Sequence, residues 1–432
     1  MKNKITIRLS ELIDAGILSS DKAQEIQLFY TKGQDQSQNR LFVIFGVLGA
    51  ILVGLGIILI LAHNWDELSR ITKTIIAFIP LLLGQGFCAF SLSKKADSQA
   101  WKEASAAFLF FAVGACISLI SQIYNIPGNL SSFVLTWMLL CLPLVYIMRS
   151  SIVSLMYLIG ITYYTCETGY WNVVDPLEPY LFWALLIIVL PHYHYLYKNR
   201  PNSNFMVFHN WLIPLSVTIV LGTIADRSDE IMFVAYLSLL GLFYLIGYLP
   251  FFKNKRRISN GYPIIGSLGT VGILLFLSFE WFWDELETKD ISFASPEFFV
   301  SVIISIAASA LLFWKIKNIR ENKVMPMEVM FILFIPIFFI GLGAPVLATI
   351  LINLLVFTLG VLTVWQGAKE NHLGILNYGL LIITALVICR FFDTNISFVL
   401  RGILFLIIGF GFFFTNYWML QKRKGLVVNG ER

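Results

Sequence analysis

The chain has 432 residues, of which 58% are hydrophobic and 13% are charged, and its mean hydropathy is +0.77. Soluble domains carry about 25% charged residues, so this composition excludes a water-soluble fold of this size. The formal net charge of +5 comes from Lys and Arg residues that lie mainly between apolar stretches. That placement is typical of a membrane topology signal and not of a nucleic-acid-binding surface, so we expect no nucleic-acid partner.

The N-terminal segment 1–40 carries charges throughout and contains no early apolar core, which is not typical of a secretory signal peptide. Within it, residues 9–18 predict a short helix that ends at Gly16. The polar residues from Ser19 to Asp21 offer N-caps for a second helix. We therefore expect a cytoplasmic helical hairpin and linker. A DNA-binding helix-turn-helix is the alternative, which the acidic residues of the segment disfavour.

Fourteen apolar stretches follow, each about long enough to cross a bilayer as a helix. Since they lack the alternating pattern of barrel strands, we expect an all-α polytopic bundle over 41–419, followed by a basic cytoplasmic tail at 420–432. The expected spans are 41–62, 74–93, 104–124, 130–148, 151–166, 179–197, 205–225, 230–251, 262–283, 296–315, 326–341, 345–366, 372–391 and 397–419. The eleventh and twelfth are so close together that a re-entrant hairpin is the alternative for this pair.

Basic residues are unevenly shared between the two sides of this arrangement. With the N-terminus in the cytoplasm, 25 of the 31 Lys and Arg residues fall on the cytoplasmic side and 6 on the outer side. Lys315 is one of the residues assigned to a cytoplasmic loop. Because cytoplasmic loops of membrane proteins are enriched in Lys and Arg, the asymmetry predicts that both termini are cytoplasmic.

The first expected span carries small residues on one face. Gly46, Ala50 and Gly54 recur at every fourth position, and small residues allow close approach of a neighbouring helix. We interpret this face as a helix-packing surface. A helix that lines a tight pore is the alternative.

The same span ends in a polar segment formed by His63, Asn64, Trp65 and Asp66. Trp65 suits the aromatic belt at a membrane surface, and Asn64 or Asp66 is suited to cap the next helical turn. An anchored and capped helix end is one interpretation of the segment. A polar cluster that faces a ligand is the other.

The pattern over residues 9–90 resembles a bacterial family of predicted membrane proteins that carry domain of unknown function 2157. The residues that carry the resemblance are Leu12, Gly16, Ile17, Ala23, Ile26 and Tyr30, the glycine-rich run 49–56, and Ala62, His63, Asn64, Trp65 and Asp66. The resemblance implies a multi-pass protein of the bacterial cytoplasmic (inner) membrane. It implies no substrate, cofactor or catalytic residue.

Ionisable residues inside apolar spans are the main functional candidates, because charge is costly in lipid. Arg401 lies in the last expected span, Arg390 closes the preceding one, and Asp393 lies between them. Glu280 lies near the outer end of the ninth span, and with Asp66 these residues share the outer half of the predicted bundle. One interpretation is an Arg–Asp pair that joins two helix ends. The other is an outward-facing cavity whose arginines bind an anion such as a phosphate or a carboxylate.

The remaining motifs exclude several classes of chemistry. The sequence contains no Walker A, GxSxG, HExxH or glycine-rich nucleotide fingerprint, which argues against ATP-driven pumping by this chain. The five cysteines lie within or at the ends of apolar runs without a CxxC, so we interpret them as structural thiols. We expect no metal and no cofactor.

Three functions remain open for a lipid-embedded chain of this kind. We favour a secondary transporter or flippase-like carrier for an anionic or lipid-linked substrate, because spans are many, loops are short and charges lie within spans. A membrane-embedded transferase that uses a lipid-linked donor at the outer face is the second, with Asp66 and Glu67 as candidate acids. A non-catalytic membrane partner or sensor is the third. An enzymatic activity is thus left open but is not favoured.

Overall fold

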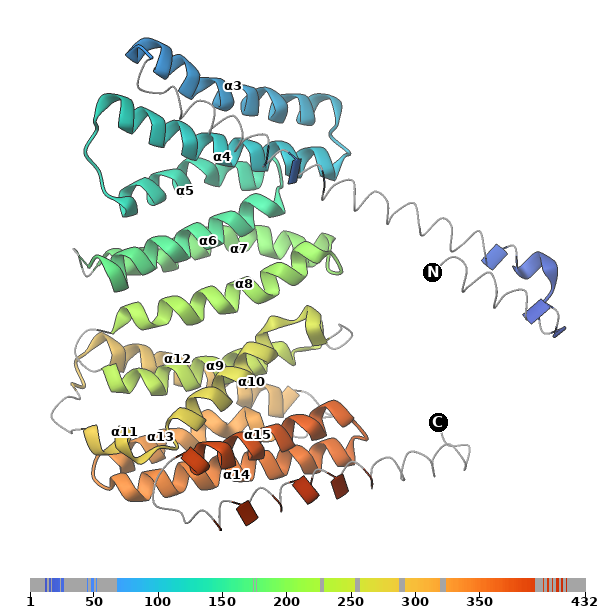
Figure 1. Cartoon of the computed structure of the whole chain (residues 1–432), viewed down its shortest axis with the longest axis vertical. Coiled ribbons are helices and arrows are strands. Elements are labelled where there is room, and N and C mark those ends of the chain that lie inside the picture. The colour runs from blue at the N-terminus through green and yellow to red at the C-terminus, as the bar shows by residue number, and fades with distance from the viewer. Residues whose placement is uncertain are drawn as a thin grey trace. The chain divides into compact units, whose positions relative to one another are not determined.

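The structure is a computed structural model in which every described element is a helix. Within the described residues no strand is found, so the predicted all-α class is confirmed (Figure 1). The structure describes residues 68–173, 175, 177–225, 229–252, 257–286, 292–318 and 324–392, and scattered residues within 12–52 and 399–417.

The chain divides into two compact units, unit 1 (Met1–Ser154) and unit 2 (Leu155–Arg432), and the division falls inside one helix. The sequence does not predict this division, because apolar residues continue through it without a linker. The predicted limits of the membrane domain at residues 40 and 419 lie outside the described residues and stay predictions.

Unit 1 contains α3 (Arg70–Lys94), α4 (Gln99–Tyr124), α5 (Leu130–Ile147) and the first residues of α6 (Ser151–Cys166). In Figure 1 α3, α4 and α5 lie side by side, with α4 in contact with both of the others. The α4–α5 contact is close, since Trp137 Nε1 donates a hydrogen bond of 2.7 Å to the carbonyl oxygen of Phe110. Trp137 also covers Gly114, where a Cβ atom would lie 2.6 Å from the indole ring.

The helix ends of unit 1 follow from local sequence. Ser69 Oγ accepts from the backbone N–H of Thr72 at 3.2 Å and starts α3. Asn125 adopts a left-handed conformation with φ of 51° and ends α4. Asn129 Oδ1 accepts from the backbone N–H of Ser132 at 2.9 Å and starts α5.

Unit 2 contains the rest of α6 and the elements that follow it. They are η2 (Glu167–Trp171), η3 (Glu178–Tyr180), α7 (Leu181–Asn199), α8 (Asn204–Leu221), η4 (Gly222–Ile224), η5 (Asp229–Ile231), α9 (Met232–Gly247), η6 (Pro250–Phe252), η7 (Arg257–Ser259), α10 (Gly261–Phe276), α11 (Glu280–Glu285), α12 (Pro296–Asn318), η9 (Pro326–Val329), α13 (Met330–Gly341), α14 (Pro345–Lys369) and α15 (Leu373–Phe392).

The core of unit 2 is apolar and aromatic. α9 contacts α10, α12 and α13, and α14 contacts α13 and α15 (Figure 1). Buried side chains from four of the helices meet there, among them Leu274, Trp283, Phe334, Phe338 and Ile352. Because helices in lipid gain little from hydrophobic burial, such close aromatic contacts hold the bundle largely through van der Waals attraction.

Eight described helical segments are long enough and apolar enough to cross a membrane, and three shorter apolar helices accompany them. The long segments are Arg70–Lys94, Gln99–Tyr124, Leu130–Ile147, Glu178–Asn199, Asn204–Ile224, Pro296–Asn318, Pro345–Lys369 and Leu373–Phe391. The shorter ones are Met232–Gly247, Gly261–Phe276 and Pro326–Gly341. The chain is therefore a helical membrane protein, while the number of fourteen spans and the N-in, C-in orientation stay predictions.

Most predicted spans coincide with described helices. The span predicted at 151–166 has the bounds of α6, and the eleventh and twelfth predicted spans form a helical hairpin, η9–α13 followed by α14. The first and last predicted spans, at 41–62 and 397–419, lie almost entirely outside the described residues.

The ninth predicted span needs a correction. It was expected to run unbroken over 262–283, but α10 ends at Phe276 and a separate short helix, α11, begins at Glu280. The chain turns between them because Trp283 folds back, and its Nε1 donates a hydrogen bond of 2.7 Å to the carbonyl oxygen of Leu277. The indole is fully buried against the core, so the turn gives its N–H group a hydrogen-bond acceptor that an apolar site would otherwise lack.

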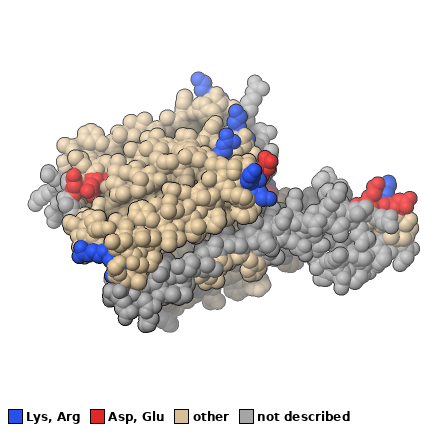
Figure 2. Space-filling view, turned by 90° about the horizontal axis from the view of Figure 1, so that it is seen from above, with Lys and Arg blue, Asp and Glu red and all other residues tan. Residues whose placement is uncertain are grey.

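The described surface is mainly uncharged. In the view of Figure 2, Lys, Arg, Asp and Glu side chains lie near the margins of the described part, and the broad faces between them carry other residues. Large apolar side chains such as Leu82, Ile187 and Ile303 are exposed on the helices. An apolar surface of this kind is suited to contact with lipid and not with water.

Candidate functional site

Most of the predicted site residues lie outside the described residues. These are Arg401, Asp393, His63, Asn64, Trp65 and Asp66, together with the packing residues Gly46, Ala50 and Gly54. Their proposed roles stay predictions. Of the predicted cluster, the structure places Arg390 and Glu280.

Arg390 and Glu280 belong to adjacent parts of one corner of unit 2. Arg390 is near the end of α15, and its Nη2 donates a hydrogen bond of 3.2 Å to Ser278 Oγ in the turn between α10 and α11. Its guanidinium carbon lies 4.7 Å from the centroid of the Phe279 ring. Glu280 follows directly as the first residue of α11 and is exposed. The two predicted residues are thus brought to the same turn, and the described contacts of Arg390 are with the two residues before Glu280.

A different charged pair, Lys315 with Glu328, is buried in unit 2. Lys315 Nζ and Glu328 Oε1 form a salt bridge, and the two side chains are 5% and 0% exposed. Lys315 lies in the last turn of α12, and Glu328 lies in η9, which begins with Pro326. Lys315 was assigned to a cytoplasmic loop, but it lies within a helix and is buried. The chain returns after α12 and places an acid against the lysine, which allows the charge to stay inside the protein.

Two tyrosines at the end of α9, Tyr244 and the C-cap residue Tyr248, complete this group, which we call the ion-pair cluster: Lys315, Glu328, Tyr244 and Tyr248. Lys315 Nζ lies 5.6 Å from the centroid of the Tyr248 ring, within reach of a cation–π attraction. The Tyr244 hydroxyl lies 3.5 Å from the Tyr248 hydroxyl and 3.5 Å from Met325 Sδ. The second carboxylate oxygen, Glu328 Oε2, is buried and has no hydrogen-bond partner among the described residues.

The functional interpretation of this cluster depends on Glu328 Oε2. Bringing two charges out of water costs several kcal/mol per ion, so a buried pair is a weak source of stability. A buried carboxylate with one oxygen that accepts no hydrogen bond contributes even less to stability. Ionisable residues kept inside a membrane bundle at this cost are candidates for function by default.

Two polar contacts hold α15 against α10 and the turn that follows it. Ser267 Oγ, in the middle of α10, donates to the Tyr378 hydroxyl at 2.7 Å. Arg390 donates to Ser278 Oγ, in the turn after α10, at 3.2 Å.

A buried acid in unit 1, Glu103, gives a useful contrast. It is 3% exposed, and its carboxylate accepts from Ser150 Oγ at 2.5 Å, from the backbone N–H groups of Ser151 and Ile152 at 2.9 Å each, and from Gln99 Nε2 at 2.6 Å. Both oxygens are satisfied, and they cap the start of α6 at the positive end of the helix dipole. Glu103 is therefore architectural, whereas Glu328 is not fully satisfied.

Sequence inspection missed Glu103, Lys315 and Glu328 because each lies at or next to the edge of a predicted span. A signal for Glu328 was nevertheless present, since an acid two residues after Pro326 at the start of an apolar run is typical of a first helical turn. Within the described chain, no group of three or more His, Cys, Asp or Glu side chains is placed to hold a metal ion.

Residues 10–154 match the family model described as Predicted membrane protein (DUF2157). The match confirms the resemblance predicted over 9–90 and extends it to the end of unit 1. No curated protein and no solved structure matches the chain. The ion-pair cluster and Arg390 lie in unit 2, outside the matched residues.

Proposed function

We propose that this membrane protein is a secondary carrier of the bacterial cytoplasmic membrane in which the ion-pair cluster couples an anionic substrate to a proton. The observation that carries the proposal is Glu328 Oε2, a buried carboxylate oxygen without a hydrogen-bond partner among the described residues, in a residue that is 0% exposed. A charged pair that is kept inside a membrane bundle, at the cost of removing both ions from water, is a candidate for carrying an ion.

Protonation of Glu328 has a consequence for its partner. Without the carboxylate charge, Lys315 is a buried cation with no counter-ion, a state that costs several kcal/mol. An anionic substrate restores the balance, because Lys315 then pairs with the anion while Glu328 carries the proton. One proton and one negative charge enter together, so the loaded and empty sites have the same net charge.

The transport of an anion is also consistent with the second cation of unit 2. Arg390 lies in the last turn of α15, beside the turn after α10, at the end that the predicted topology places outside. A guanidinium suits planar anions such as carboxylates and phosphates. We propose that it attracts the anion at the outer surface, while Lys315 holds it deeper in the chain.

The two alternative functions have less support. The transferase was based on acids at positions 66 and 67, which lie outside the described residues. The carrier is favoured because a buried and incompletely satisfied acid is expensive in a protein that only supports another.

The proposal is tested with the full chain in liposomes that enclose a pH-sensitive dye. Inorganic phosphate, glycerol 3-phosphate, gluconate and citrate are added outside in turn, and a transported anion should acidify the interior. Glu328→Gln mimics the protonated acid, so it should lose acidification but keep exchange of the same anion across the membrane. Lys315→Met should lose both activities.

The matched control is Glu370→Gln, which changes an exposed acid at the end of α14. It should retain both acidification and exchange. Absence of acidification with every anion, or undiminished acidification by Glu328→Gln, would contradict proton-coupled anion transport.

A further inference from the structure

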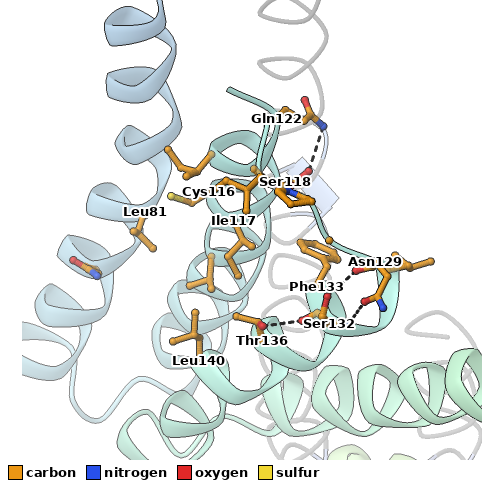
Figure 3. Close-up of a pocket in the computed structure, with 18 residues that line it drawn as sticks. Leu81, Cys116, Ile117, Ser118, Gln122, Asn129, Ser132, Phe133, Thr136 and Leu140 are labelled. Atoms are coloured by element: carbon orange, nitrogen blue, oxygen red, sulfur yellow. Dashed lines mark hydrogen bonds between the residues drawn. The ribbon is translucent and has the colours of Figure 1, made fainter. Parts of the chain in front are cut away.

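A cavity of about 920 Å³ lies in unit 1, at the end of the helices where α4 turns into α5. Figure 3 shows Leu81 of α3 across from Cys116 and Ile117 of α4, with Asn129, Ser132 and Phe133 closing the other side. Its volume falls in the range of about 300–1,000 Å³ that is usual for small-molecule sites.

The described lining of this cavity is uncharged and combines polar with apolar side chains. Hydroxyl and amide side chains, Ser118, Ser121, Gln122, Asn129 and Ser132, come from the last turns of α4 and the first turn of α5. Apolar side chains that include Leu81, Ile117 and Leu140 line the rest, and no Lys, Arg, Asp or Glu is among the described lining residues.

The polar groups are held by a fixed loop. The backbone N–H of Ile126 donates to the carbonyl oxygen of Ser121 at 2.9 Å, and Ser121 Oγ donates to the carbonyl oxygen of Ile126 at 3.1 Å. Ser132 Oγ donates to the carbonyl oxygen of Asn129 at 3.1 Å. Gln122 Nε2 lies 3.5 Å from Ser118 Oγ, a long contact that a better hydrogen-bonding partner would replace at little cost (Figure 3).

We propose that this cavity binds an uncharged polyhydroxyl group, such as a sugar or glycerol unit. Serine hydroxyls and glutamine or asparagine amides both donate and accept hydrogen bonds, and hydroxyl groups of a ligand do the same. A charged ligand would lose its hydration in a cavity whose described lining offers no opposite charge, which is costly. The site is separate from the proposed function, because it lies in unit 1 and does not involve the ion-pair cluster.

The apolar part of the lining indicates what the polyhydroxyl group is attached to. Leu81, Ile117 and Leu140 suit an acyl chain attached to the headgroup, as in a neutral glycolipid. A free sugar has the same hydroxyl chemistry without the chain. The test therefore separates the two sources.

The experiment uses the full chain in a zwitterionic detergent, with native mass spectrometry to measure retained lipid. Monoglucosyl diacylglycerol is the neutral probe, and phosphatidic acid with the same acyl chains is the charged comparison. The protein should retain the glucolipid in preference to phosphatidic acid. The double variant Ser118→Ala, Gln122→Leu removes polar groups that do not cap a helix, and it should weaken retention about tenfold through loss of two hydrogen bonds.

Ser93→Ala is the matched control, since Ser93 is an exposed serine of α3 outside the cavity, and it should bind as the parent does. A second variant, Ser132→Trp, fills the cavity without removing the Asn129 cap on its backbone N–H, and should also abolish retention. Thermal unfolding of each variant shows that it is folded.

Addition of free glucose identifies the source. Competition by glucose supports a free sugar as ligand, and no competition supports a glycolipid that needs its acyl chain. Equal retention of phosphatidic acid and glucolipid, or parental retention by the folded double variant, would overturn the proposal.

Discussion

Ser150, the residue before α6, donates a hydrogen bond of 2.5 Å from its hydroxyl to Glu103 Oε2 in the first turns of α4. The two residues are 47 positions apart in sequence, so the contact ties the start of one apolar helix to the start of another. With the backbone N–H groups of Ser151 and Ile152 on the same carboxylate, an acid from α4 takes the place of a local N-cap for α6.

Glu103→Gln should destabilise the protein by about 1–3 kcal/mol, because the amide presents an N–H₂ group to a site where donors already converge. The measurement is thermal unfolding in detergent, with Glu370→Gln as the exposed-acid control. Parental stability of Glu103→Gln would mean that the carboxylate does not hold the start of α6.

Lys315 and Glu328 should behave as a coupled pair in a double-mutant cycle. Lys315→Met alone should cost about 3–5 kcal/mol, since it leaves a buried carboxylate without its counter-ion. The double variant Lys315→Met, Glu328→Gln should recover much of that loss because no buried charge remains. Thermal stability of the four proteins checks it, and additive losses would show that the two side chains do not interact.

Gly341→Ala should be destabilising, because an added Cβ atom would overlap the buried ring of Trp283. Overpacking of this kind costs about 1–3 kcal/mol. Gly272→Ala in α10 is the control, since no atom lies within 4 Å of its Cβ position and alanine favours a helix by about 0.5–1 kcal/mol. We expect opposite signs for the two changes in thermal unfolding. If Gly341→Ala were also stabilising, the contact between α11 and α13 would be looser than described.

Both termini should be cytoplasmic, as the 25-to-6 distribution of Lys and Arg predicts. A reporter that is active only in the cytoplasm should work when fused to residue 432, and a reporter active only outside should not. The opposite result would place the C-terminus outside and contradict the predicted orientation. A fusion after residue 286, in the loop that follows α11, should report the outer side and tests the middle of the predicted order.

Helix positions could be predicted from the sequence because they depend on local features. The apolar run 151–166 has the bounds of α6, and the run predicted at 130–148 begins where α5 begins. The run predicted at 74–93 starts four residues late, because Ser69 caps α3 at Arg70. The break between α10 and α11 could not be predicted in this way. Its cause is the indole of Trp283, which is apolar in a hydropathy profile and yet needs a hydrogen-bond acceptor once buried.

The candidate site was harder to predict, because the partner of a buried charge comes from a segment that is distant in sequence. Arg390 and Glu280 were expected to share the outer half of the bundle, and in the structure Arg390 contacts Ser278 and Phe279, the two residues before Glu280. Lys315 was assigned to a cytoplasmic loop because it stands at the end of an apolar run. Its burial depends on Glu328, which approaches only after the chain has turned back.

Hydropathy and charge pattern alone establish that this protein is a helical membrane protein, and motifs in its N-terminal part resemble a family of predicted membrane proteins, whose model matches residues 10–154. Hydropathy and local motifs are properties of single residues and short segments, so they can be recognised without knowledge of the fold. The packing of the helices was needed to establish that both oxygens of Glu103 accept hydrogen bonds, while Glu328 Oε2 has no hydrogen-bond partner among the described residues. Partners of a buried acid come from other segments of the chain, and their arrival depends on how the helices pack.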